Sequence, residues 1–249
     1  MILMPKLIYF SGVGRSGSTV LTSILAEAPQ VCSIGEFLQF GVNFQRSARC
    51  ECGALLGECR FWQDIADHVG ATPAQLAKLS TRLQDATRSS RPLAFARTLA
   101  GGPHSSDESL AEELAKLLTA AAEVSSADVV VESSKAPFMI PLLSRAPGFS
   151  TYVIRVVRSR RGVVDSYAQS KRSSPRGRRH YYTRHNPLSV SMMWASKNLL
   201  SAHIERTCRR YGVATRVLQF EEFLAAPLST IESLADWVGH PLAPESLTA

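Results

Sequence analysis

The sequence contains no uninterrupted apolar run that approaches the length of a membrane span, and its first residues do not resemble a signal peptide. Residues 1–5 lead straight into a short apolar segment, without the charged and then apolar order of a leader. Aromatic residues make up only 8% of the chain and do not alternate with its basic clusters, as a platform for single-stranded nucleic acid would require. We therefore expect no membrane span, no nucleic-acid partner and a cytoplasmic location.

Cysteine is also scarce. The 249 residues include five cysteines, and the only cluster is formed by Cys50, Cys52 and Cys59. Their spacing, C-x-C-x₆-C, differs from the paired C-x₂-C of common structural zinc sites. Reduced buried thiols, a disulfide and a metal clip all stay open, and the reduced state is the default in a cytosolic chain.

The composition as a whole is that of a soluble globular chain, with 45% hydrophobic and 20% charged residues. The length allows one large domain with a sizeable core, so we expect a single domain over residues 1–249. The formal net charge of +7 suits an anionic ligand, although charge alone would equally fit a nucleic acid or a membrane surface.

A glycine-rich segment, GVGRSGST at residues 12–19, lies between an apolar run at residues 7–10 and a helical pattern at residues 20–25. Strand, turn and helix in this order form a phosphate cradle, because glycines let N–H groups turn inward and the helix start adds its positive dipole end. Ser18 stands where a P-loop has its lysine, and the cation is Arg15, inside the loop. A nucleotide kinase needs that lysine and a hydroxyl-held magnesium ion. A kinase-like phosphotransferase stays an alternative, although neither the lysine at position 18 nor a carboxylate for the metal is evident in the sequence.

A second motif follows another predicted strand. Residues 152–157 are apolar and β-branched, Arg158 comes directly after them, and Ser166 lies eight residues later on the following helix. An arginine at the carboxyl end of a strand lies where open α/β sheets bind ligands, and a serine about two turns into the next helix can reach the same anion. Alone, such an arginine is usually a solvated surface charge.

Two further charged residues are candidates for catalysis. Lys135 lies in the polar run after the three valines at residues 129–131, and Glu36 follows the first helix and a break at Pro29. The polar run that carries Lys135 falls at the carboxyl end of a predicted strand, and Glu36 offers a carboxylate of the kind that serves as a general base. An exposed lysine and a solvated glutamate are the plain alternatives, and we interpret Glu132 as structural, facing a basic neighbour.

Taken together, these motifs resemble the sulfotransferases that use 3′-phosphoadenosine-5′-phosphosulfate (PAPS), particularly the Golgi and bacterial branch. The family's 5′-phosphosulfate loop reads Arg-Ser-Gly-Ser/Thr-Thr, which residues 15–19 match. The resemblance implies transfer of the sulfuryl group of PAPS to a hydroxyl, or secondarily an amine, with release of adenosine 3′,5′-bisphosphate and no required metal. A bacterial cytoplasmic enzyme is the simplest interpretation, because PAPS is made in the cytosol.

The resemblance also assigns roles to residues. Glu36 would deprotonate the acceptor, and Lys135 together with Arg15 would support the transferring group; His180 and His185 are the next candidates for the base. Arg158 and Ser166 would hold the 3′-phosphate. The 5′-phosphosulfate would lie in the loop, on Gly14, Arg15, Ser16, Gly17, Ser18 and Thr19. A non-catalytic protein that binds adenosine 3′,5′-bisphosphate or a sulfated ligand would keep these phosphate sites and would not need Glu36.

For the fold, the resemblance implies an α/β, P-loop-like, three-layer architecture with a central, mostly parallel sheet. Residues 73–124, rich in Ala and Leu at helical spacing, are interpreted as a helical insertion over the cofactor face. The basic run at residues 171–185 is either a solvated loop or a lid for an acidic acceptor. Relatives continue past this chain's last residue with a segment that closes over the nucleotide, so either the chain is truncated or other residues supply those contacts. Acceptor identity and oligomeric state are not indicated.

Overall fold

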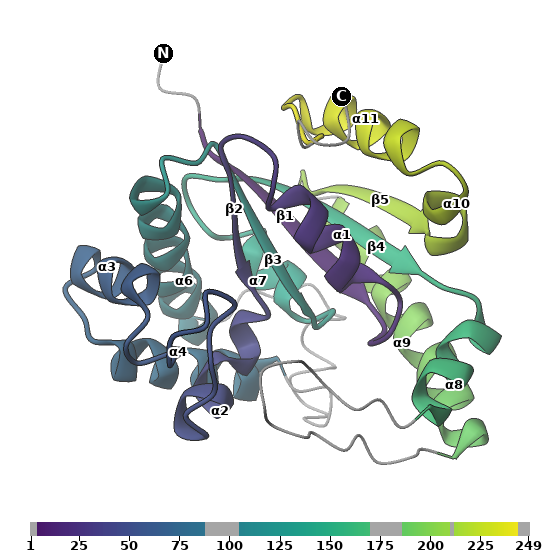
Figure 1. Ribbon diagram of the computed structural model, residues 1–249, viewed down its shortest axis with the longest axis horizontal. Coiled ribbons are helices and arrows are strands. Elements are labelled where there is room, and N and C mark those ends of the chain that lie inside the picture. The colour runs from purple at the N-terminus through teal and green to yellow at the C-terminus, as the bar shows by residue number, and fades with distance from the viewer. Residues whose placement is uncertain (1–3, 88–104, 170–185, 210–211, 244–249) are drawn as a thin grey trace.

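The computed structural model describes residues 4–87, 105–169, 186–209 and 212–243, and of residues 105–107 it describes only the backbone. Its centre is a five-stranded sheet in which every pairing is parallel, with the order β2-β3-β1-β4-β5 (Figure 1). The strands are β1 (Lys6–Gly12), β2 (Val31–Gly35), β3 (Val129–Lys135), β4 (Ser150–Val157) and β5 (Ala214–Gln219). The expected central parallel sheet is confirmed.

Alternating side chains of the strands enter two separate cores. On β1, Leu7 and Tyr9 pack into the larger core on one face, whereas Ile8 and Phe10 pack into the smaller core on the other. A central strand buried on both faces needs apolar residues at every position, which is why this segment reads as a continuous hydrophobic run. Helices therefore cover both faces, and the three-layer arrangement is confirmed.

The smaller core is covered by α1 (Ser18–Leu25), α10 (Phe220–Ala225) and α11 (Pro227–Val238). The larger core includes residues of η1 (Phe37–Gln39), α2 (Phe40–Gln45), α3 (Arg60–His68), α4 (Pro73–Ala86), α6 (Ser105–Val124), α7 (Met139–Leu143) and α9 (Pro187–Cys208). A third, small cluster joins α8 (Arg160–Ala168) to α9 and to the loop after β1. Within the described ranges, no helix combines the length and the apolar composition needed to traverse a bilayer.

Local signals explain where several helices begin and end. Thr72 and Gln75 form a capping box at the start of α4, with Pro73 as its first helical residue. Helix α11 ends at Gly239, whose φ of 68° lies in the left-handed region that suits glycine at a helix end. In segment 73–124, helices α4 and α6 pack into the larger core, and α6 contacts β2 and β3. The basic run at residues 171–185, with His180 and His185, lies outside the described residues.

Candidate functional site

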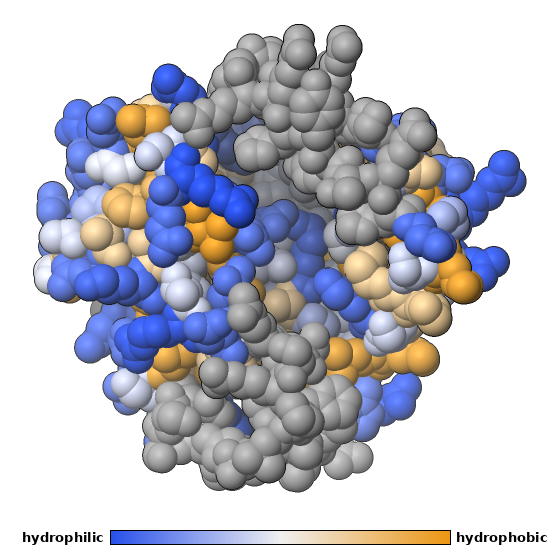
Figure 2. All heavy atoms as spheres, turned by 90° about the horizontal axis from the view of Figure 1, so that it is seen from below, coloured by the Kyte–Doolittle hydropathy of each residue, from blue (hydrophilic) through white to orange (hydrophobic). Residues whose placement is uncertain are grey.

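The carboxyl ends of four strands bring the predicted site residues to one edge of the sheet. Glu36 follows β2, Lys135 ends β3, the glycine-rich loop follows β1, and Arg158 follows β4. Since the strand order is β2-β3-β1-β4 and neighbouring strands lie about 4.8 Å apart, these four features line up in that order along the edge. Figure 2 views the molecule from this side and shows a hollow among the described residues, lined mainly by hydrophilic side chains.

Two glycines of the loop lie close to aromatic side chains. Gly17 has a φ of 98°, and a Cβ there would lie 2.1 Å from the ring of Phe220. A Cβ on Gly14 would lie 2.7 Å from the hydroxyl oxygen of Tyr167. The Phe220 ring and the positive φ therefore require glycine at position 17, whereas the Tyr167 hydroxyl close to Gly14 is the end of a side chain that can shift.

Three buried hydroxyls lie in the loop, at the first residue of α1 and one turn further along that helix. The oxygens of Ser16, Ser18 and Thr22 are buried and have no hydrogen-bond partner among the residues that the structure describes. Leaving such a group unsatisfied costs about 1–3 kcal/mol. The Ser16 and Ser18 hydroxyls lie at the positive end of α1, where donors suit an anion with several oxygens. Thr19, by contrast, is exposed.

Arg15 and Lys135 both have a backbone conformation that is uncommon for residues with a side chain. Their φ angles are 68° and 64°. The left-handed region costs a non-glycine residue about 1–3 kcal/mol and persists where the surroundings impose it, typically at functional sites. The Arg15 guanidinium lies 5.8 Å from the centre of the Tyr167 ring. The hydroxyl of the same tyrosine lies close to Gly14.

Arg158 lies against the same loop from the β4 side. Its Nη1 donates to the Arg15 carbonyl oxygen at 3.3 Å, and its guanidinium lies 5.3 Å from the ring centre of Phe220. The Arg158 carbonyl oxygen accepts a hydrogen bond of 2.9 Å from the Trp194 indole. Ser166 is buried on α8, directly before Tyr167. The two predicted anion sites, after β1 and after β4, are therefore adjacent.

Glu36 and Lys135 form an ion pair that links the ends of β2 and β3. The Glu36 side chain is 42% exposed and the Lys135 side chain 11% exposed, so the pair opens to solvent on the carboxylate side. Lys135 Nζ also donates to the Ser133 carbonyl oxygen at 3.0 Å. Two residues predicted from separate motifs are thus direct partners.

Glu132, three residues before Lys135 on β3, is completely buried. One carboxylate oxygen accepts from the Phe37 amide at 3.0 Å, and the other accepts from the Ser134 amide at 3.0 Å. The Ser134 hydroxyl also donates to Glu132. Burial raises the pKa of Glu132 to about 7, against the lowering effect of these hydrogen bonds and of the Lys135 charge. The Glu132 side chain thus holds the backbone of Phe37, the residue that directly follows Glu36.

Several residues of the site were not predicted as such. Thr22 lies four residues after Ser18, on the same face of α1, so helical spacing was an available signal. Phe220 follows β5 at the same sheet edge, and Tyr167 comes directly after Ser166. Partial burial lowers the pKa of the Lys197 ammonium on α9, and the charge of Lys135 lowers it further, although the residue keeps an exposed surface.

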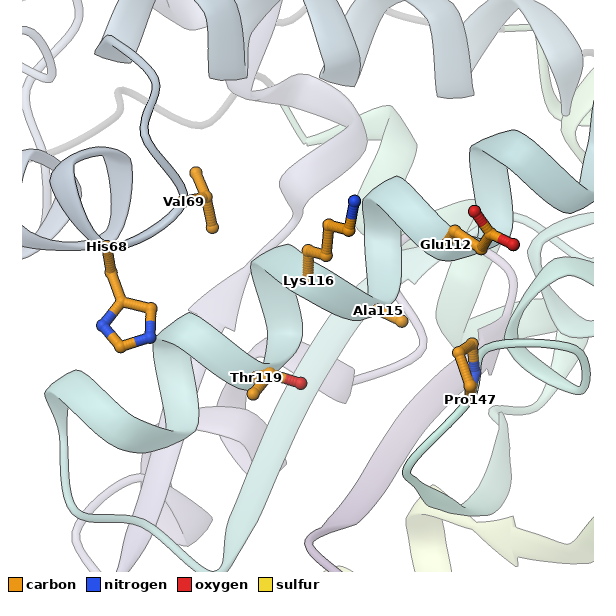
Figure 3. Close-up of a pocket in the computed structure, with 7 residues that line it drawn as sticks. All are labelled: His68, Val69, Glu112, Ala115, Lys116, Thr119 and Pro147. Atoms are coloured by element: carbon orange, nitrogen blue, oxygen red, sulfur yellow. The ribbon is translucent and has the colours of Figure 1, made fainter.

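A separate pocket lies away from this edge. Figure 3 shows its lining, and its volume is about 680 Å³. Its residues come from α6, the end of α3 and the segment before β4: His68, Val69, Glu112, Ala115, Lys116, Thr119 and Pro147. None of the predicted site residues lines it, so it takes no part in the chemistry considered below.

Comparison with known proteins was made by sequence and by structure. No family model matches the chain, and a search of the curated proteins finds no match. Among solved structures, it is similar to the sulfotransferase domain from the curacin biosynthetic pathway, with a TM-score of 0.53, 15% identity and coverage of 97% of this chain and 76% of that one. It is also similar to sulfotransferase STF9 from Mycobacterium avium, with a TM-score of 0.50, 12% identity and coverage of 98% of this chain and 66% of that one. The chain has the α/β fold of the sulfotransferases, as its motifs predicted.

Proposed function

We propose that the protein transfers the sulfuryl group of PAPS to a hydroxyl group of an acceptor, or secondarily to an amine, and releases adenosine 3′,5′-bisphosphate. The observation that carries this proposal is the order of groups along the sheet edge: Glu36, Lys135, the glycine-rich loop and Arg158. This order matches the order of parts in the reaction, from acceptor through sulfuryl group and 5′-phosphate to 3′-phosphate. A cytoplasmic location, where PAPS is made, belongs to the same proposal.

The nucleotide side of the edge, which we define as the loop of residues 12–19, Thr22, Arg158 and Ser166, would hold PAPS. The buried, unpartnered hydroxyls support the binding of an oxyanion there. Arg15 and Arg158 provide planar guanidinium groups that bind phosphate and sulfate oxygens without a metal. Contact of Arg158 with the loop backbone supports one continuous site for the 5′-phosphosulfate and the 3′-phosphate.

The acceptor side, which we define as Glu36, Lys135 and Glu132, would carry the chemistry. Glu36 would accept the proton of the acceptor hydroxyl as its oxygen forms a bond to sulfur. The bond from sulfur to the bridging phosphate oxygen breaks at the same time, and Lys135 would offset the negative charge that develops on that oxygen. Glu132 would be a positioning residue, because it binds the backbone amide next to Glu36.

Cations near the acceptor side favour an acidic acceptor. Burial lowers the pKa of Lys197 on α9, and the charge of Lys135 lowers it further, so two lysines contribute positive charge to this side of the edge. We propose that a carboxylate, phosphate or sulfate on the acceptor offsets that charge.

The two alternative functions, a kinase-like phosphotransferase and a non-catalytic binding protein, explain less of this arrangement. A kinase-like phosphotransferase needs a lysine where the buried Ser18 hydroxyl stands. A protein that only binds a nucleotide would use the nucleotide side and would leave the Glu36–Lys135 pair without a role.

Transfer of labelled sulfate from PAPS to a panel of hydroxyl and amine acceptors, with mass spectrometry of the products, tests the proposal. We expect an acceptor product that is heavier by one sulfuryl group. One equivalent of adenosine 3′,5′-bisphosphate should be released for each product molecule. Acidic acceptors should react best. A product labelled instead from the γ-phosphate of ATP, in a magnesium-dependent reaction, would contradict it.

A further inference from the structure

The cysteine cluster lies apart from the proposed reaction and has its own geometry. The sulfur atoms of Cys50, Cys52 and Cys59 all lie within 4.8 Å of one another, and those of Cys52 and Cys59 are 3.5 Å apart. Around a tetrahedral zinc ion with Zn–S bonds of about 2.3 Å, sulfur ligands are about 3.8 Å apart. The three thiols are therefore close enough to one another to share an ion.

A tight turn presents the first two thiols. The Gly53 amide donates to the Cys50 carbonyl oxygen at 2.9 Å, and the Cys50 amide donates to the Ala54 carbonyl oxygen at 2.8 Å. Gly53 has a φ of 93°, which closes the turn in a conformation that favours glycine. Arg49 pairs with Leu55 in an antiparallel bridge that holds the base of the turn.

The third thiol approaches from the next helix. Cys59 is the residue that caps α3, and its side chain makes no capping hydrogen bond to that helix. A thiolate at this position is stabilised by the positive end of the helix dipole. Cys59 is buried, Cys50 is half-buried and Cys52 is exposed, so an ion held between them is reached by solvent from one side only.

We propose that Cys50, Cys52 and Cys59 bind one Zn²⁺ ion as thiolates, with water as the fourth ligand. Thiolates select soft and borderline cations, of which zinc is the one that favours tetrahedral geometry without redox chemistry. Among the residues that the structure describes, no histidine, aspartate or glutamate joins the group, which leaves the fourth position to solvent.

The ion would act as a clip under the acceptor side of the site. Trp62 lies three residues after Cys59 on α3, and its ring packs 4.4 Å from that of Phe40 and 5.9 Å from that of Phe37. Phe37 directly follows Glu36. A metal that joins the turn to the start of α3 therefore stabilises the aromatic cluster on which the Glu36 segment rests. This inference does not depend on the identity of the donor or acceptor.

Metal analysis of the full chain, purified with reductant and without chelator, tests the site. Inductively coupled plasma mass spectrometry should find about one zinc per chain, and cobalt substitution should produce a thiolate-to-cobalt charge-transfer band. Cys52→Ser should abolish both signals, and because Cys52 is exposed this variant should keep its circular dichroism spectrum. Cys208→Ala, at a buried cysteine outside the group, is the matched control and should keep both signals.

Thermal unfolding separates a structural clip from an incidental ion. A strong chelator should lower the melting temperature of the wild type and leave that of Cys52→Ser unchanged. Folded wild type without zinc, equal zinc in wild type and Cys52→Ser, or a Cys52–Cys59 disulfide in the protein as isolated would each overturn the proposal.

Discussion

On the nucleotide side of the sheet edge, positive charge stands among hydroxyls and glycines, whereas on the acceptor side a carboxylate is paired with a lysine and a second carboxylate is buried. Arg15 and Arg158 are held by contacts with backbone and aromatic rings. Glu36 is held by Lys135 and by the hydrogen bond from its neighbouring amide to Glu132. The first arrangement fits the binding of a fixed negative charge, and the second fits the movement of a proton.

Changes on the two sides should therefore affect different quantities. Substitutions on the nucleotide side should weaken nucleotide binding. Substitutions on the acceptor side should change turnover or the pH dependence of stability while nucleotide binding is kept. A nucleotide-side substitution that changes only turnover, or an acceptor-side substitution that weakens nucleotide binding, would contradict this division.

The largest effect is expected for Glu36→Gln. The amide keeps the shape of the side chain and cannot accept the acceptor proton. General-base catalysis contributes about 10²–10⁴-fold, so kcat should fall within that range while nucleotide affinity stays nearly constant. Steady-state kinetics, calorimetry and melting temperature should be measured on one preparation, with the exposed Glu27→Gln as control. Near-normal turnover per folded molecule would show that another residue is the general base, and His180 and His185 would be the next candidates.

A second effect concerns the pH dependence of stability through Glu132. Burial raises its pKa in the folded chain to about 7, above the ordinary value of 4.5, so the folded state binds the proton more tightly than the unfolded state. This contribution is fully present below pH 4.5 and is lost as the pH rises through 7. At about 1.4 kcal/mol per pH unit, the loss amounts to about 3 kcal/mol.

Glu132→Gln has no titratable group at this position and should not show this pH-dependent loss, whatever the lost hydrogen bond costs at all pH values. Urea unfolding from pH 4.5 to 8 should give a wild-type free energy of unfolding that falls relative to the variant by about 3 kcal/mol. A constant difference between the two proteins across this range would mean that Glu132 titrates normally.

A third effect is expected for Arg158→Met on the nucleotide side. A charged hydrogen bond contributes about 1.5–3 kcal/mol, so affinity for adenosine 3′,5′-bisphosphate should fall ten-fold or more. Affinity for 5′-AMP should change little, because that ligand lacks the 3′-phosphate. Arg161→Met provides the control, because its side chain, in the first turn of the following helix α8, is 94% exposed. Equal losses for both nucleotides would show that Arg158 supports the loop rather than the 3′-phosphate.

The smallest effect is expected on removal of magnesium. Ser18 in place of the P-loop lysine, together with Arg15, indicates charge stabilisation by side chains and amides. Transfer should survive an excess of EDTA. A loss of activity that magnesium restores would favour the kinase-like alternative, whereas a loss that only zinc restores would trace to the cysteine cluster.

The residues of the nucleotide side could be identified as candidates from the sequence because their signals are local. Strand, glycine turn and helix follow one another within the first 25 residues, and Arg158 and Ser166 lie within one βα unit. The aromatic residues Tyr167 and Phe220 were not predicted as parts of the site, because their contacts with Gly14 and Gly17 join segments far apart in the chain.

The acceptor side was predicted only as separate residues. Strand β2 is only five residues long and was not predicted from the sequence. Its pairing with β3 brings Glu36, directly after β2, next to Lys135 at the end of β3. Strand β3 also runs through the polar residues to Lys135, because hydrogen bonds from backbone amides and Ser134 satisfy the buried Glu132 carboxylate. Hydrophobic periodicity carries no signal for a polar residue that is stabilised in this way.

The central claim is that one sheet edge recognises a nucleotide with both a 5′-phosphosulfate and a 3′-phosphate. Calorimetric titration of the wild-type protein with adenosine 3′,5′-bisphosphate and with 5′-AMP tests it most directly. Because Arg158 and Ser166 should bind the 3′-phosphate, the bisphosphate should bind at least ten-fold more tightly. Equal affinity for the two nucleotides would contradict the assignment.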